Sequence, residues 1–159
     1  MFGRFLPWVS GPSLSLILFL IPGTPSILAE QAVSEPAVHE RDLLAESYLN
    51  ERLALWQQRL NLKDWKISIT MSHPSDLKPK TLGNIHWDAD KKSAMIRVLD
   101  ASDYKMTFHD MLDDMEFTVV HELIHLELSS LPRSEASRRD EEHAVNQIAD
   151  ALLKLDRQK

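Results

Sequence analysis

Residues 116–128 read E-F-T-V-V-H-E-L-I-H-L-E-L and contain the pattern H-E-x-x-H at His121, Glu122 and His125. Positions four apart lie one above the other on one face of a helix, so His121 and His125 can present two imidazole nitrogens to one metal ion. Glu122 lies one step round the helix, within reach of a water on that ion but not placed as a third ligand. Apolar residues at helical spacing predict burial of the flank beside the histidines. They are Phe117, Val120, Ile124 and Leu128.

The composition restricts the kind of metal site and partner that this chain can have. The 159 residues include no cysteine, which excludes disulfides, thiolate zinc sites and a cysteine nucleophile. Any metal site must therefore use histidine and carboxylate ligands. The formal net charge of −6 provides no basic face for nucleic acid. The length, with 43% hydrophobic and 26% charged residues, predicts one globular domain.

The first 29 residues have the layout of a secretory signal peptide. Arg4 is their only charged residue, an apolar run covers residues 14–21, and Ala29 offers a small side chain before a cleavage site. The apolar run is too short to span a bilayer, so we expect no stable membrane span after signal removal. The prediction is a secreted or periplasmic protein, or a cytoplasmic one if the start codon is mis-assigned. Residues 30–40 are predicted to be a linker.

Residues 41–157 are predicted to form one α+β domain. Its first element is an amphipathic helix over residues 41–60. Apolar and polar residues then alternate in segments that predict three strands, at 65–71, 82–87 and 94–99. The polar turn at residues 88–92 joins the last two strands into a hairpin. The expected sheet is therefore small, of about three strands, and either antiparallel or mixed.

The region after the hairpin is predicted to contain two helices. Residues 100–114 carry five aspartates without the pattern of a calcium loop, and we expect a solvated loop that leads to a helix start near Asp114. The helix that carries the histidines then continues to about Leu131 and is stopped by Pro132. The last helix is expected to run from Ser134 to about Leu155.

The last helix offers a third metal ligand. Two helices joined by a short break pack antiparallel, so a carboxylate early in the second helix can approach the histidines of the first. Glu141 and Glu142 both lie early in this helix, and apolar periodicity alone slightly favours Glu141 as the third ligand. Zinc held by two histidines and a carboxylate, with an open water position, is typical of catalytic sites.

The combined pattern His121-Glu122-x-x-His125 and Glu142-x-x-x-Asn146 resembles the gluzincin arrangement of H-E-x-x-H followed by E-x-x-x-D/N on the next helix. The last helix is also similar to that of small metallopeptidases of the ImmA/IrrE type, whose final motif reads approximately E-x-x-A-N-x-F-A-x-x-L-L. The positions in register are Glu142, Val145, Asn146, Ile148, Ala149, Leu152 and Leu153. This register favours Glu142 as the third ligand. The resemblance covers residues 41–155, and the order of predicted elements is similar to a minimal zincin-like fold.

The resemblance implies a Zn²⁺-dependent metallopeptidase that acts on a peptide or protein substrate. His121, His125 and Glu142 would bind zinc, and Asn146 would hydrogen-bond a zinc-bound histidine and hold its orientation. Glu122 would be the general base that activates the zinc-bound water. Stabilisation of the oxyanion needs a further donor, and the sequence does not choose among several candidates. They are Tyr104, His109, Arg138 and His143.

Other functions fit parts of the same pattern. A zinc-binding or peptide-binding protein with this fold need not cleave anything. Glu122 argues for catalysis, because structural zinc sites do not need a base beside an open position. A helical interaction protein with a chance H-E-x-x-H would require Glu142-x-x-x-Asn146 to be coincidental too. The same water chemistry would also serve a hydrolase that acts on a non-peptide amide.

Overall fold

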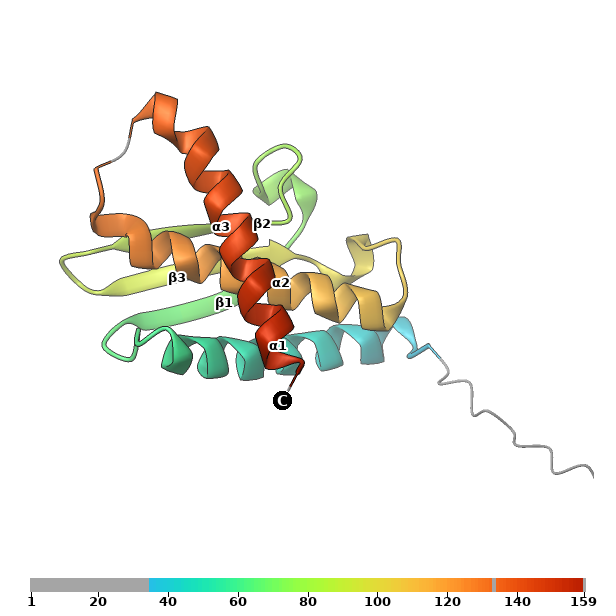
Figure 1. Ribbon diagram of the computed structural model, residues 1–159. Helices are drawn as coiled ribbons and strands as arrows, with labels where there is room; N and C mark the ends of the chain where they lie inside the picture. Colours follow the sequence, from blue (N-terminus) through green and yellow to red (C-terminus); the bar gives the residue numbers. More distant parts are fainter. Residues whose placement is uncertain (1–34, 133, 159) are drawn as a thin grey trace, which may run out of the picture. The chain divides into compact units, whose positions relative to one another are not determined.

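The computed structural model describes residues 35–132 and 134–158, so the predicted signal peptide and the first part of the predicted linker lie outside the described residues. Within these ranges the chain forms three α-helices and a three-stranded mixed sheet, which confirms the expected α+β class. In chain order the elements are α1 (Val38–Arg59), β1 (Lys66–Ser72), β2 (Gly83–Asp88), β3 (Ser93–Leu99), α2 (Phe108–Glu127) and α3 (Glu135–Asp156) (Figure 1). The first helix begins slightly earlier than predicted, so the last residues of the predicted linker are helical. No described helix is long and apolar enough to cross a membrane.

The sheet has the strand order β1–β3–β2. The predicted hairpin is confirmed, because β2 and β3 pair antiparallel with Ile85 opposite Ile96. β1 pairs with β3 in parallel, with Ile69 opposite Ile96. β2 is therefore an edge strand, and on its outer side the backbone N–H and C=O groups pair with no other described strand.

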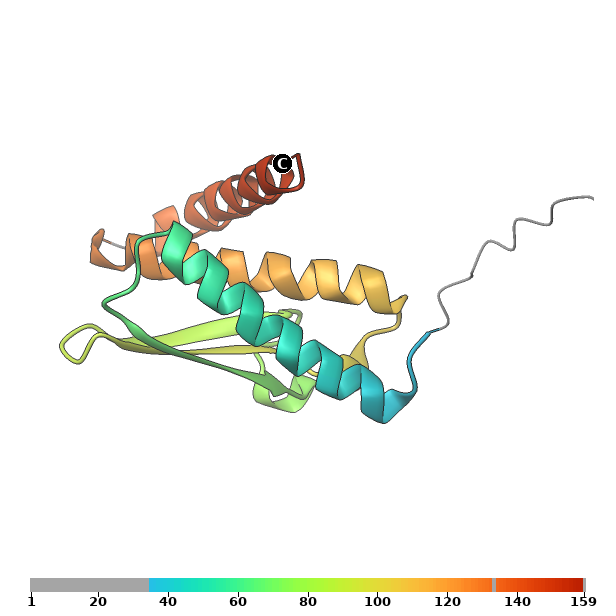
Figure 2. The ribbon, with the colours of Figure 1, turned by 90° about the horizontal axis from the view of Figure 1, so that it is seen from below.

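The helix that carries H-E-x-x-H lies at the centre of the packing. α1 and α2 cover one face of the sheet, and α3 crosses α2 on the side away from the sheet (Figure 2). Ile96 and Val98 of β3 are fully buried, and so are Met115, Val119 and Leu123 of α2. Each such side chain stabilises the fold by roughly 1.5–3 kcal/mol of transfer free energy. α2 is consequently fixed from the sheet side, from α1 and from α3.

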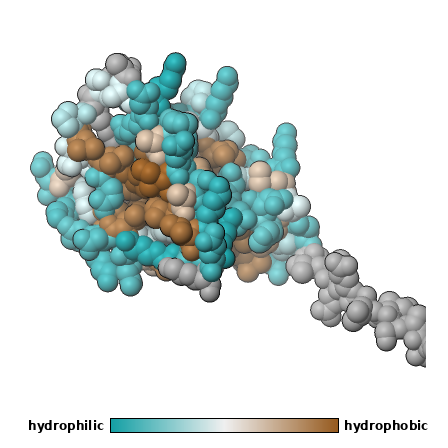
Figure 3. All heavy atoms as spheres, viewed as in Figure 1, coloured by the Kyte–Doolittle hydropathy of each residue, from teal (hydrophilic) through white to brown (hydrophobic). Residues whose placement is uncertain are grey.

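α3 packs on α2 through a narrow apolar stripe. Val145, Ala149 and Leu153 recur every four residues and are buried. Ile148 and Leu155 of the same helix remain exposed, at 44% and 61%. Figure 3 shows hydrophobic surface beside α3 where it crosses α2, on a face that is otherwise largely hydrophilic. The hydrophobic contact that holds α3 in place is therefore small.

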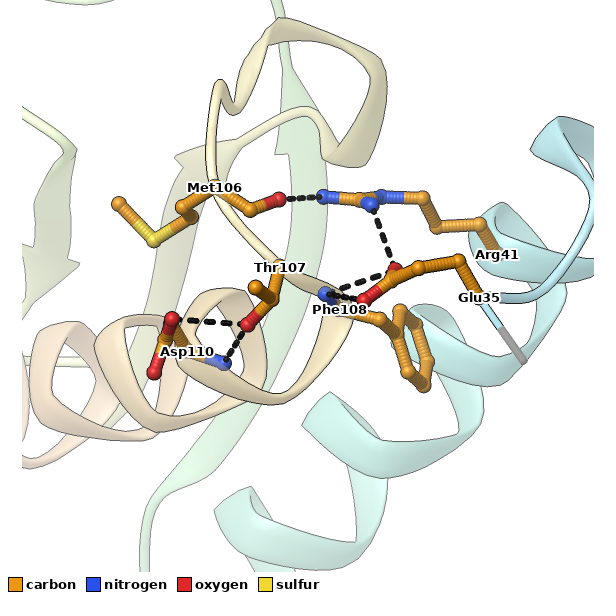
Figure 4. Close-up of polar contacts among 6 residues, drawn as sticks. All are labelled: Glu35, Arg41, Met106, Thr107, Phe108 and Asp110. Carbon is orange, nitrogen blue, oxygen red and sulfur yellow. Dashed lines mark hydrogen bonds and ion pairs between the residues drawn. The ribbon is translucent and has the colours of Figure 1, made fainter. Parts of the chain in front are cut away.

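α2 begins at Phe108, so the prediction that residues 100–114 form a loop is wrong for the second half of that segment. Thr107 is the N-cap: its hydroxyl oxygen accepts a hydrogen bond from the backbone N–H of Asp110 at 3.2 Å and donates to the Asp110 carboxylate at 2.7 Å (Figure 4). The carboxylate of Glu35 accepts from the backbone N–H of Phe108 at 2.9 Å. Acidic side chains favour the positive end of a helix, so three of the five aspartates that suggested a solvated loop, Asp110, Asp113 and Asp114, belong to its first turns.

Glu116 is a buried carboxylate that joins α2 to α1. It is 5% exposed and accepts hydrogen bonds from the indole N–H of Trp56 at 2.8 Å and from the hydroxyl of Tyr48 at 3.0 Å. A guanidinium nitrogen of Arg52 lies 3.7 Å from the same carboxylate. Burial, followed by the charge of Glu116, raises the pKa of the Tyr48 hydroxyl and keeps it a donor. Three residues on one face of α1 thus share one acceptor on α2.

Replacing Glu116 with alanine removes the acceptor of two buried donors. We expect Glu116→Ala to lower the free energy of unfolding by about 2–4 kcal/mol, because Trp56 and Tyr48 lose their partner and Arg52 loses one of its counter-charges. Urea unfolding followed by circular dichroism measures this change. Glu127→Ala, at an exposed position of the same helix, is the control and should cost less than about 0.5 kcal/mol. Equal costs for the two variants would contradict the role of Glu116.

Candidate metal centre

Three side chains with metal-binding groups meet where α3 crosses α2. His121 and His125 lie one turn apart on α2, and Glu142 extends from the first half of α3. One ligand atom from each residue lies within 4.8 Å of the other two. The buried stripe of α3 begins at Val145, one turn after Glu142. The packing that docks α3 on α2 therefore also brings the carboxylate to the histidines.

The distances among the three ligand atoms suit a tetrahedral zinc ion. The Nε2 atoms of His121 and His125 are 3.1 Å apart. The Glu142 carboxylate places one oxygen 3.4 Å from Nε2 of His121 and the other 3.4 Å from Nε2 of His125. Bonds of roughly 2.0–2.2 Å in a tetrahedron put neighbouring ligand atoms roughly 3.3 Å apart. The residues present therefore fit zinc.

The second nitrogen of each imidazole is held by α3. Nδ1 of His121 lies 3.0 Å from Oδ1 of Asn146, and Nδ1 of His125 lies 3.0 Å from a carboxylate oxygen of Glu141. Both partners can accept, so in the neutral tautomer that binds metal each Nδ1 carries the proton and each Nε2 offers its lone pair. The two lone pairs then face each other at 3.1 Å, an arrangement that a cation between them stabilises.

Glu141 and Glu142 occupy different positions at this site. Glu142 faces both Nε2 atoms and its side chain is 49% exposed, whereas the Glu141 side chain lies behind the ring of His125 and is 16% exposed. Apolar periodicity favoured Glu141 because it identifies the side chain that points most directly into the helix interface. A ligand must instead reach the open side of the imidazoles. The geometry favours Glu142 as the ligand and Glu141 as the residue that orients His125.

Glu122 is a buried carboxyl beside the ligands. It is 7% exposed, and no residue in the described ranges donates a hydrogen bond to it. Burial, followed by the charge of Glu142, raises the pKa of Glu122 to about 7, while the charge of Lys78 acts in the opposite direction. Burial also lowers the pKa of His121, as does the charge of His125, and this favours the neutral imidazole that binds metals. A carboxyl with a pKa near neutral can exchange protons with water at physiological pH.

The edge strand β2 passes directly beside Glu122. A Cβ atom on Gly83, the first residue of the strand, would lie 2.4 Å from Cγ2 of Thr118, 2.8 Å from the carbonyl oxygen of Arg97 and 3.6 Å from Oε1 of Glu122. Glycine is needed for so close an approach of strand to helix. Sequence reasoning missed this residue, because a glycine at the start of a strand is an ordinary feature.

The proposed oxyanion donors are separated by the fold. Tyr104 is buried in the segment before α2, and His109 lies in the first turn of α2. His109 is more than three turns before His121, about 18 Å along the helix axis, and is too far to act at the site. Arg138 and His143 are exposed on the first half of α3, the part of the helix that carries Glu142. These two are the candidates on the helix that carries Glu142.

A second group of polar side chains lies at the ends of the parallel strands. His73 follows β1, Asp100 follows β3, and Asp103 lies in the next turn. Nδ1 of His73 is 2.8 Å from the Asp103 carboxylate, and this hydrogen bond is the main reason that the pKa of His73 is raised. The His73 side chain is 64% exposed. The pair links the loop after β1 to the segment after β3.

Comparisons with protein-family models, with curated proteins and with solved structures find no match for this chain. The resemblance to gluzincins therefore rests on the motif residues alone and stays a prediction. The fold of the described ranges is of the α+β class, with a three-stranded mixed sheet and three helices.

The raised pKa of Glu122 should make the stability of the metal-free protein depend on pH. The unfolded carboxyl titrates near about pH 4.3 and the folded one near 7. Between these values the folded state binds more protons than the unfolded state, so the free energy of unfolding falls as pH rises. We expect Glu122→Gln to gain stability relative to wild type by on the order of 3–4 kcal/mol between about pH 4 and pH 8.

Urea unfolding in the presence of EDTA, with both proteins at a series of pH values, measures this difference. Groups that titrate equally in the two proteins cancel in the comparison. A difference that stays constant over the whole range would contradict the raised pKa of Glu122.

Proposed function

We propose that this protein is a zinc-dependent metallopeptidase. The observation that carries the proposal is the convergence of His121, His125 and Glu142: the two Nε2 atoms are 3.1 Å apart, and a different carboxylate oxygen of Glu142 lies 3.4 Å from each of them. His121, His125 and Glu142 would hold zinc with three protein ligands, as catalytic zinc sites do, whereas structural sites use four. The buried Glu122 beside these ligands is the general base.

Each side chain has a separate task in peptide hydrolysis. A zinc ion held by His121, His125 and Glu142 would supply Lewis acidity. Glu122 accepts the proton of the attacking water and returns it to the leaving amine. Asn146 and Glu141 hold both Nδ1–H groups and fix the orientation of the rings. Because Glu122 is buried, it exchanges protons with groups at the site rather than with bulk solvent.

We assign the substrate to the outer edge of β2. An extended peptide can add to an unpaired strand edge through backbone hydrogen bonds. Gly83 brings this strand against α2 next to Glu122, so a peptide on the edge would pass the general base. The implied partners are peptides or proteins and not nucleic acid, in keeping with the net charge of −6.

The proposal includes a minimal zincin-like fold of the gluzincin type and a secreted or periplasmic location. The order of helix, strand, hairpin, helix and helix supports a minimal zincin-like fold, and the placement of Glu142 and Asn146 supports the gluzincin type. The signal-like residues 1–29 support a secreted or periplasmic location. The competing function is a zinc-binding or peptide-binding protein that cleaves nothing. It shares the metal centre and differs in the role of Glu122.

We expect the purified protein to bind about one zinc ion per chain and Glu142→Ala to lose it, because two histidines alone hold zinc weakly. Metal analysis after equilibration with zinc measures the stoichiometry. Glu141→Ala is the matched variant. It should keep the ion with an affinity reduced by about 10- to 100-fold, since Glu141 orients His125 without contacting the metal. If only Glu141→Ala loses zinc, Glu141 is the ligand and Glu142 is not. A wild type that binds no zinc would contradict the proposed function.

Glu122→Gln should keep zinc and lose peptidase activity. The amide preserves the shape of the side chain but cannot accept a proton, so kcat/KM should fall by roughly 10²- to 10⁴-fold. Hydrolysis of a fluorogenic peptide mixture measures the loss, and Glu127→Gln on the exposed side of α2 controls for changes in the helix. An active Glu122→Gln protein would contradict the mechanism. A zinc-loaded wild type that cleaves no peptide would favour the non-catalytic function.

A further inference from the structure

The loop between β1 and β2, residues 73–82, is fixed at its start, middle and end. At the start, His73 bonds to Asp103 at 2.8 Å. In the middle, the side chain of Leu77 is buried at 7% exposure. At the end, the carbonyl oxygen of Leu82 accepts a backbone hydrogen bond of 2.8 Å from the end of β3. The backbone of the loop is therefore anchored at three points.

Lys78 lies in a closed turn of this loop, close to Glu122. Its carbonyl oxygen accepts hydrogen bonds from the backbone N–H of Thr81 at 3.1 Å and from the Thr81 hydroxyl at 2.8 Å. The chain then enters β2 at Gly83, where a Cβ would lie 3.6 Å from Oε1 of Glu122. In agreement with this path, the charge of Lys78 is felt at Glu122 and lowers the pKa of that carboxyl against the effect of burial.

The ammonium group of Lys78 is exposed and makes no ion pair with any residue in the described ranges. Other lysines of the chain are paired with a neighbouring aspartate: Lys91 lies 2.8 Å from Asp88, and Lys154 lies 2.6 Å from Asp150. A lysine is a compact, strongly hydrated charge on a flexible stem, so a fixed backbone determines the region that it can reach. The cation of Lys78 is available to a ligand at the site.

We propose that Lys78 binds a carboxylate of the substrate close to the scissile bond and gives the enzyme a preference for acidic peptides. This inference rests on the proposed peptidase function. Glu122, Glu141 and Glu142 place three carboxylates at the site, and the chain carries a net charge of −6. Glu122 and Glu141 would repel a substrate carboxylate close to them, and the cation of Lys78 offsets this repulsion. The carboxylate belongs either to an Asp or Glu side chain or to a free peptide C-terminus.

The test compares peptides that differ in one carboxylate. Starting from the peptide that the wild type cleaves best, one set carries Asp or Asn at each position flanking the cleaved bond. A second set ends in a free carboxylate or in an amide, which separates the two sources. We would measure kcat/KM for the zinc-loaded wild type, Lys78→Met and Lys78→Glu. Lys80→Met is the matched control, because Lys80 is an exposed lysine of the same turn.

We expect the wild type to prefer one acidic peptide over its amide partner by about fivefold, the size of an exposed ion pair. Lys78→Met should lose this preference, Lys78→Glu should prefer the amide form, and Lys80→Met should behave as the wild type. A preference that survives in Lys78→Met, or that falls equally in Lys80→Met, would overturn the inference. So would a changed pH profile with unchanged preference, because Lys78 would then act on Glu122 alone.

Binding separates failure of this inference from failure of the proposed function. The same labelled peptides are titrated by fluorescence anisotropy into zinc-loaded Glu122→Gln, with and without Lys78→Met. If the wild type cleaves no peptide, the peptidase proposal fails. A binding preference for the acidic peptide that depends on Lys78 would still support the carboxylate site. Equal binding of acidic and amide peptides would overturn it.

Discussion

The imidazole rings of His121 and His125 are held from behind by two hydrogen bonds that cross from α2 to α3, to Asn146 and to Glu141. These bonds fix the orientation of the rings and also link the two helices where they cross. They form because the apolar stripe of α3 packs on α2, and the same crossing brings Glu142 to the open side of the rings. A metal ion at this point would bind both helices, so metal binding and the docking of α3 stabilise one another.

Two buried carboxylates on α2 differ in the donors that surround them. Glu116 faces α1, where an indole N–H, a phenol hydroxyl and a guanidinium satisfy it. Glu122 faces the edge strand and has no such donors in the described ranges, so burial raises its pKa to about 7. Partners stabilise a buried charge, whereas their absence leaves a carboxyl that readily exchanges a proton. One helix thus carries one buried acid that is satisfied by donors and one whose pKa is raised.

Local patterns predicted most of the elements. The alternation of apolar and polar residues identified the hairpin of β2 and β3, and Ser134 marked the start of the last helix, where it is the N-cap of α3. The start of α2 was placed too late, because its aspartates resemble a solvated loop until Thr107 and Glu35 are seen to cap it. The parallel pairing of β1 with β3 was left open. It joins segments separated by a whole strand, and no local pattern encodes such a contact.

The sequence by itself determined the chemistry that is possible: two histidines one helical turn apart, a glutamate beside them and no cysteine. These facts depend on residue type and on helical spacing, which are local properties of the chain. Only the tertiary structure distinguished Glu142 from Glu141, and only it placed Gly83 and Lys78 near Glu122. Those relations depend on the crossing of two helices and on the approach of an edge strand to α2. Both are set by side-chain packing between segments far apart in the chain.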